Sequence, residues 1–172
     1  MRKGYIQVYT GNSKGKTTAA LGLALRAAGA GLKVFIAQFI KKRRCSEHKA
    51  LERFSDLITF KQYGTGFLKG DKPTIPEIHV AKKGLEEIKK IILSSKYDMV
   101  ILDEINIAVH HKLFSVDELL KVLDTKPAGV ELVLTGRYAH KKIIEKADLV
   151  TEMKEIKHYL QKGIKARAGI EF

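Results

Sequence analysis

The sequence has little of several features that define particular classes of protein. Its 172 residues include a single cysteine, Cys45, which excludes an internal disulfide framework and a metal site built from clustered cysteines. No apolar run approaches the ~18 residues that a membrane-spanning helix needs. The apolar stretch behind the basic start at residues 1–3 is too short for a signal peptide. These absences lead us to expect a cytoplasmic protein without a membrane segment.

Acidic residues are also scarce relative to basic ones. The chain has 32 lysines and arginines against 19 aspartates and glutamates, a formal net charge of +13. Such a surplus predicts an anionic partner, and a nucleic acid, a phosphorylated ligand, an acidic protein or a membrane surface would each fit. Hydrophobic residues nevertheless make up 45% of the chain, which is enough for a packed core in one domain that covers residues 1–172.

Short β-rich runs alternate with longer helical patterns along the chain. Six strands are predicted, at residues 5–9, 33–39, 57–62, 99–103, 131–135 and 149–153. Helices are predicted at residues 17–28, 78–95, 119–123 and 140–147, with capping boxes at 74–77 and 115–118 ahead of the second and third. The central strands contain continuous apolar blocks, which suit strands covered on both faces. The pattern therefore predicts an α/β fold with a mainly parallel β-sheet flanked by helices.

A glycine-rich turn with a lysine lies between the first predicted strand and the first predicted helix. A phosphate loop needs backbone amides that form a concave nest, a lysine that reaches the phosphates and a hydroxyl for Mg²⁺. Gly11 and Gly15 allow the tight backbone, Lys16 supplies the charge and Thr17 supplies the hydroxyl. The eight-residue pattern has glycine where this chain has Thr10. The turn predicts a nucleoside triphosphate site, and the alternative is an ordinary turn with a solvated lysine.

Two acids, Asp103 and Glu104, stand at the end of the fourth predicted strand. An acid that emerges from a buried strand binds Mg²⁺ directly or through water, and a second acid shares the metal or orients a nucleophile. The alternative is an acidic cap for the segment that follows. Arg137 follows the next strand, where it either pairs with phosphate oxygens or lies free on the surface.

These motifs alone predict a P-loop protein that binds a Mg-nucleotide. Hydrolysis or phosphoryl transfer is the commonest reaction at such a site. The basic charge also suits a RecA-like ATPase or a nucleic-acid-binding P-loop module, although the sequence has no helix-turn-helix signature to support it.

Several short blocks, in a fixed order from residue 4 to the last residue, extend this interpretation. They lie at residues 10–20, 38–41, 64–67, 102–104, 134–137, 147–148, 157–158, 163–166 and 169–170. Taken together, these blocks resemble the ATP:cob(I)alamin (corrinoid) adenosyltransferases of bacterial cobalamin synthesis and salvage. The resemblance implies a P-loop NTPase fold of the RecA-like type. It also implies transfer of the 5′-deoxyadenosyl group of ATP to cob(I)alamin or a related corrinoid, with release of triphosphate.

The resemblance implies roles for individual residues. Mg²⁺ (or Mn²⁺) would be held by Thr17, Asp103 and Glu104. Phe67 would face the corrinoid and displace its axial ligand, which makes reduction to cobalt(I) easier. The residues with an implied catalytic role are Lys16, Thr17, Glu104 and Phe67. The residues that would wrap the triphosphate are Gly11, Asn12, Ser13, Lys14, Gly15, Lys16, Thr17 and Thr18, with Arg137 as a further contact.

The resemblance also implies partners and reveals departures. Family members are commonly homodimers and use an acidic electron donor such as flavodoxin, for which the basic run at residues 41–44 is a candidate docking site. Lys69 stands where many members have a tryptophan, and Ser13 replaces the usual loop glycine. The first predicted strand starts near residue 5, so we expect no N-terminal arm of the kind that covers the site in longer members. A relative that binds ATP but has lost corrinoid chemistry is a further alternative.

Overall fold

The computed structural model describes residues 3–43, 45–66 and 72–172. These residues form a six-stranded sheet in the order β3-β2-β4-β5-β1-β6, and every neighbouring pair of strands is parallel. The strands are β1 (Ile6–Thr10), β2 (Val34–Phe39), β3 (Ile58–Tyr63), β4 (Met99–Asp103), β5 (Glu131–Thr135) and β6 (Leu149–Glu152). The predicted α/β fold is confirmed, and each strand lies within one residue of its predicted bounds.

The strand register brings three carboxyl ends to the same level of the sheet. Leu134 of β5 is aligned with Val8 of β1 on one side and with Leu102 of β4 on the other. On the next strand, Gln38 of β2 is aligned with Asp103 of β4. The loop after β1 and the acids at the end of β4 therefore meet at one edge, where open parallel sheets bind their ligands.

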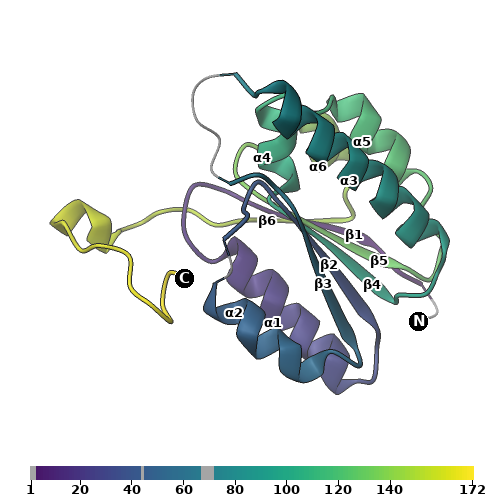
Figure 1. Ribbon diagram of the computed structural model, residues 1–172, viewed down its shortest axis with the longest axis horizontal. Helices are drawn as coiled ribbons and strands as arrows, with labels where there is room; N and C mark the ends of the chain where they lie inside the picture. The colour runs from purple at the N-terminus through teal and green to yellow at the C-terminus, as the bar shows by residue number, and fades with distance from the viewer. Residues whose placement is uncertain (1–2, 44, 67–71) are drawn as a thin grey trace.

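Helices cover both faces of the sheet (Figure 1). The helices α1 (Lys16–Gly29) and α2 (Ser46–Leu51) lie on one face. The helices on the other face are α3 (Ile75–Leu93), α4 (Ile105–His110), α5 (Val116–Leu123) and α6 (Lys141–Lys146). Two short 3₁₀ helices, Glu52–Phe54 and Tyr159–Lys162, complete the regular structure of the described residues.

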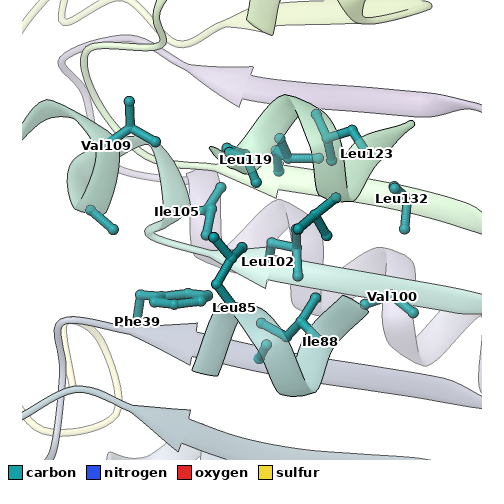
Figure 2. Packing of buried hydrophobic residues seen from close by; sticks show 14 of the residues in the cluster. Phe39, Leu85, Ile88, Val100, Leu102, Ile105, Val109, Leu119, Leu123 and Leu132 are labelled. Atoms are coloured by element: carbon teal, nitrogen blue, oxygen red, sulfur yellow. The ribbon is translucent and has the colours of Figure 1, made fainter. Parts of the chain in front are cut away.

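Each face has its own buried cluster of apolar side chains. On the α1 side, Ala20 and Ala24 share a cluster with Ile36 and Ile101, and the small alanines allow α1 to pack close to the sheet. The larger cluster on the other face contains Phe39 and the residues around it in Figure 2. β2, β4 and β5 are buried along their whole length, as their apolar blocks predict. Among the described residues, no helix is long and apolar enough to span a membrane.

Both predicted capping boxes form. The Thr74 backbone N–H donates to Glu77 Oε2 at 2.6 Å, so α3 begins at Ile75, three residues before its predicted start. The Ser115 N–H donates to Glu118 Oε2 at 2.7 Å, and the Glu118 N–H donates back to Ser115 Oγ at 3.1 Å. Each box satisfies backbone donors that have no partner inside the helix.

Glu118→Gln is expected to reduce the acid sensitivity of folding. The hydrogen bond from the Ser115 backbone, with a further one from Lys82, lowers the pKa of Glu118 in the folded protein. A carboxyl whose folded pKa is depressed stabilises the fold above its unfolded pKa of 4.5 and loses this contribution as the pH falls through its folded pKa. Urea unfolding should therefore show a destabilised variant at pH 7, and a smaller difference from the wild type at pH 3.

Glu86→Gln is the matched control for this experiment, because it makes the same change on an exposed position of α3. An equal destabilisation in both variants at pH 7 would contradict a specific role for the α5 capping box.

Candidate active site

The turn between β1 and α1 has the backbone of a phosphate loop. Gly11 and Gly15 have φ values of +99° and +118°, a region that disfavours other residues. A Cβ at Gly11 would lie 2.4 Å from the carbonyl oxygen of Met153, which follows β6. The Ser13 N–H donates to that same oxygen at 3.0 Å, and the Met153 N–H donates to the Thr10 carbonyl at 2.9 Å. The end of β6 therefore fixes the shape of the loop from outside.

Lys16, the first residue of α1, is buried under this loop. Its Nζ donates to the carbonyl oxygens of Gly11 at 2.8 Å and Ser13 at 2.6 Å. Burial lowers the pKa of Lys16, while the nearby Glu104 carboxylate acts in the opposite direction. An ammonium group with few water contacts interacts strongly with anions, so the loop presents a concentrated positive charge.

Asp103 lies at the centre of a buried hydrogen-bond network. Its Oδ1 accepts hydrogen bonds from the Thr17 hydroxyl at 2.8 Å and from the Thr135 hydroxyl at 2.6 Å. Its Oδ2 accepts one from Gln38 Nε2 at 2.9 Å. The network thus joins α1, β2, β4 and β5, and it brings the loop threonine next to the strand acid as the sequence predicts.

Glu104 begins α4 from a left-handed backbone conformation, with φ +59°. Its N–H donates to Thr135 Oγ1 at 3.0 Å, and its Oε1 lies 4.0 Å from Lys41 Nζ. Burial, together with the neighbouring Asp103 carboxylate, raises the pKa of Glu104. Two ionised carboxyl groups so close together repel each other, which a nearby positive charge would relieve. Both acids therefore lie beside the phosphate loop, and Glu104 also occupies the N-cap position of α4.

A pocket of about 820 Å³ opens above these groups. Eight of the predicted site residues line it, namely Ser13, Lys14, Gly15, Lys16, Thr17, Thr18, Glu104 and Arg137. Gly11 and Asn12 lie in the loop but do not line the pocket, and Asp103 is buried beneath Thr17. Phe67 and Lys69 lie outside the described residues. Ser13 is not among the residues with positive φ, so its position does not require glycine.

The glycine-containing segment after β3 lies next to this pocket. The Gly66 N–H donates to the carbonyl oxygen of Ile40 at 3.0 Å, and Ile40 and Lys41 both line the pocket. Ile40 has φ +65°, a strained conformation for a β-branched residue. The segment that the resemblance assigns to the corrinoid therefore begins beside the pocket that contains the phosphate loop.

Three residues of the site were not assigned a role from the sequence. Gln38 and Thr135 bind Asp103 directly, and Asn106 Nδ2 donates to the Gly136 carbonyl at 3.3 Å, which ties α4 to the loop that contains Arg137. In the sequence, each of the three is a polar residue in an otherwise apolar stretch that is fully buried in the structure. Such residues are expensive to bury without a partner, which makes them candidates for site positions.

A parallel sheet with this loop after β1 and an acid pair at the end of β4 defines a P-loop nucleotide-binding protein. The family model described as ATP:corrinoid adenosyltransferase BtuR/CobO/CobP matches residues 2–172. The chain therefore belongs to the ATP:corrinoid adenosyltransferase family.

Individual relatives agree with this family. A corrinoid adenosyltransferase of Sinorhizobium sp is 40% identical over 99% of this chain and 81% of the relative. Corrinoid adenosyltransferases of Pseudomonas aeruginosa and Escherichia coli K12 are each 36% identical, over 99% of this chain and 84% and 86% of their own lengths. The family favours a transferase over the alternative of a nucleic-acid-binding ATPase.

Proposed function

We propose that this chain transfers the 5′-deoxyadenosyl group of Mg-ATP to cob(I)alamin or a related corrinoid at the pocket above the phosphate loop. The observation that supports this most is the contact between Thr17 of the loop and Asp103 of β4, because it joins the two halves of the motif expected to bind Mg-ATP in a member of this family. The corrinoid is the nucleophile, and its cobalt(I) attacks the 5′ carbon of ATP. The cobalt–carbon bond forms as the bond between that carbon and its phosphate oxygen breaks, and triphosphate leaves.

The protein contributes charge and position to this reaction. Cobalt(I) is itself a strong nucleophile, so no side chain has to act as a general base. The leaving triphosphate gains negative charge, and Lys16 with the amides of the phosphate loop would stabilise it. Arg137 is exposed at the pocket and supplies a further cation for the phosphate oxygens. Holding the 5′ carbon in line with the corrinoid accounts for the rest of the acceleration.

The oxygen donors around Thr17 fit a resident Mg²⁺ or Mn²⁺. A hydroxyl and two carboxylates, from Thr17, Asp103 and Glu104, are the hard ligands that Mg²⁺ prefers, alongside phosphate oxygens. When bound, the metal neutralises charge on the triphosphate. The hydrogen bonds from Gln38 and Thr135 hold the Asp103 carboxylate in a fixed orientation toward Thr17.

Further features of the proposed function rest on the resemblance. Phe67 would contact the corrinoid from the segment that begins at Gly64. The protein would act as a homodimer in the cytoplasm, and an acidic reductase such as flavodoxin would supply electrons to the corrinoid. Lys42 and Arg43 are exposed beside the pocket-lining Lys41, which supports this end of the sheet as the docking side.

Anaerobic incubation with Mg-ATP and chemically reduced cobalamin tests the proposal. We expect a light-sensitive product with a cobalt–carbon bond, accompanied by one triphosphate per corrinoid. A protein that binds ATP but yields no such product would contradict the proposed transfer. Hydrolysis of ATP stimulated by DNA or RNA, with steeply salt-dependent binding, would instead support the nucleic-acid alternative.

A further inference from the structure

The chain that follows β6 leaves the sheet and turns back to the pocket. In Figure 1 this part, drawn in yellow, extends away from the sheet and returns toward α1 and α2. We define the return segment as residues 159–172, beginning with the 3₁₀ helix Tyr159–Lys162. Its last four residues line the pocket together with the phosphate loop. At its far end, the Ser46 hydroxyl of α2 donates to the carbonyl oxygen of Phe172 at 3.0 Å.

Lys14 of the phosphate loop holds the return segment from the other side. Its Nζ donates to Glu171 Oε1 at 2.8 Å, to the Ile170 carbonyl at 2.8 Å and to the Tyr159 hydroxyl at 3.2 Å. An ammonium group has three N–H donors, so these contacts account for all of them. The lysine that the sequence assigns to the triphosphate is therefore engaged with another part of the chain.

Glu171 connects these contacts within the segment. It accepts hydrogen bonds from the Arg167 N–H at 2.7 Å and from Tyr159 OH. The Arg167 guanidinium lies 3.3 Å from the same carboxylate, and the Glu171 side chain is only 17% exposed. Hydrogen bonds from Arg167 and Lys14 lower the pKa of Glu171, which keeps it ionised. The segment thus has its own charged network, organised on one carboxylate.

We infer that Glu171 is a positioning residue that, through Lys14, fixes residues 169–172 as one wall of the ATP pocket. The inference rests on the proposed function, because the wall encloses the pocket assigned to ATP. Lys14 acts on the nucleotide through this wall and does not bind the triphosphate itself. Closing the open side of a pocket excludes water from the phosphates and strengthens their interaction with Lys16.

Glu171→Gln, Lys14→Gln and the double variant test this inference as a cycle. Each single variant is expected to raise the KM for ATP roughly tenfold, the factor that corresponds to ~1.4 kcal/mol, while kcat with saturating ATP changes little. The double variant should be no worse than either single variant, since both changes break the same contact. Lys14→Arg, which keeps the charge, should restore most of the ATP affinity. Glu86→Gln is the matched control, because it alters an exposed acid of α3 that does not line the pocket.

A second measurement is independent of catalysis. Hydrogen exchange of the backbone amides at residues 167–171 should be faster in Glu171→Gln and Lys14→Gln than in the wild type, and unchanged in Glu86→Gln. The inference would be overturned if hydrogen exchange at these amides were the same in both variants as in the wild type. It would also be overturned if Lys14→Gln raised the KM for ATP far more than Glu171→Gln and the two effects added in the double variant. If the wild-type protein transferred no adenosyl group, only the proposed function would be overturned, because hydrogen exchange is measured without the reaction.

Discussion

Lys16→Ala is expected to reduce kcat/KM for adenosyl transfer by roughly 10²–10³-fold, the range typical for removal of one preorganised electrostatic contact. Lys16 is the cation that the phosphate loop encloses, and no other described lysine donates to the Gly11 and Ser13 carbonyl oxygens. The same change should leave the free energy of unfolding nearly unaltered. Burial already disfavours the charged form of this lysine, so its removal relieves a desolvation cost as it removes two hydrogen bonds.

Equilibrium binding of ATP, steady-state kinetics and urea unfolding together measure this prediction. Lys121→Ala is a suitable control, because Lys121 is an exposed lysine of α5 on the opposite face of the sheet from α1. Retention of wild-type ATP affinity by Lys16→Ala would show that the loop is not the phosphate site. A large loss of stability would show that Lys16 acts mainly in holding the loop together.

Asp103→Asn is expected to damage both the fold and the site. The carboxylate accepts three hydrogen bonds, from Thr17, Thr135 and Gln38. An asparagine retains one acceptor oxygen and places an NH₂ group against a neighbouring donor, so at least one of these contacts becomes a clash of two donors. Because a hydrogen bond to a charged group contributes ~1.5–3 kcal/mol, we expect the free energy of unfolding to fall by roughly 2–4 kcal/mol.

The functional part of this prediction concerns the metal. At a temperature where the variant is fully folded, the dependence of ATP binding on Mg²⁺ should weaken, since Thr17 loses its oriented partner. Denaturant unfolding and Mg²⁺ titrations of ATP binding measure the two effects separately, with the exposed Asp56→Asn as the control. If the free energy of unfolding fell while the Mg²⁺ dependence of ATP binding stayed that of the wild type, Asp103 would stabilise the fold without a role in metal binding.

Most of the sheet could be predicted because its strands are apolar on both sides and end at strong turn signals. The runs that became β2, β4 and β5 have no competing helical pattern, and the capping boxes at Thr74 and Ser115 mark two helix starts. The short helices α2 and α4 have no such signal. The Cys45 N–H, at the start of α2, donates to His48 Nδ1 at 2.8 Å, and α4 starts from the left-handed Glu104. The cap of α2 is local but uses cysteine and histidine in place of the usual Ser/Thr and Glu. The start of α4 depends on the contact of the Glu104 N–H with Thr135 of β5, which the local sequence does not show.

The candidate site likewise has a part that the sequence predicts and a part that it does not. The spacing of Gly15, Lys16 and Thr17 was enough to place the phosphate loop, because the motif is contiguous and its geometry is local. The partners of Asp103 come from α1 and from two other strands, so their convergence depends on strand order. The engagement of Lys14 with Glu171 joins residues 157 positions apart, and no local pattern indicates such a pair.

The position of β1 has a consequence for the order in which the molecule is built. β1 precedes the other five strands of the sheet in the sequence, but both of its neighbours, β5 and β6, come after residue 130. The Tyr5 N–H likewise donates to Glu131, 126 residues away. Joining segments so distant is slow, because the entropy of closing a long loop is lost before the contacts form. A nascent chain therefore has no phosphate loop of fixed shape until Met153 has been added, and ATP can stabilise only a chain that already contains β6 and Met153.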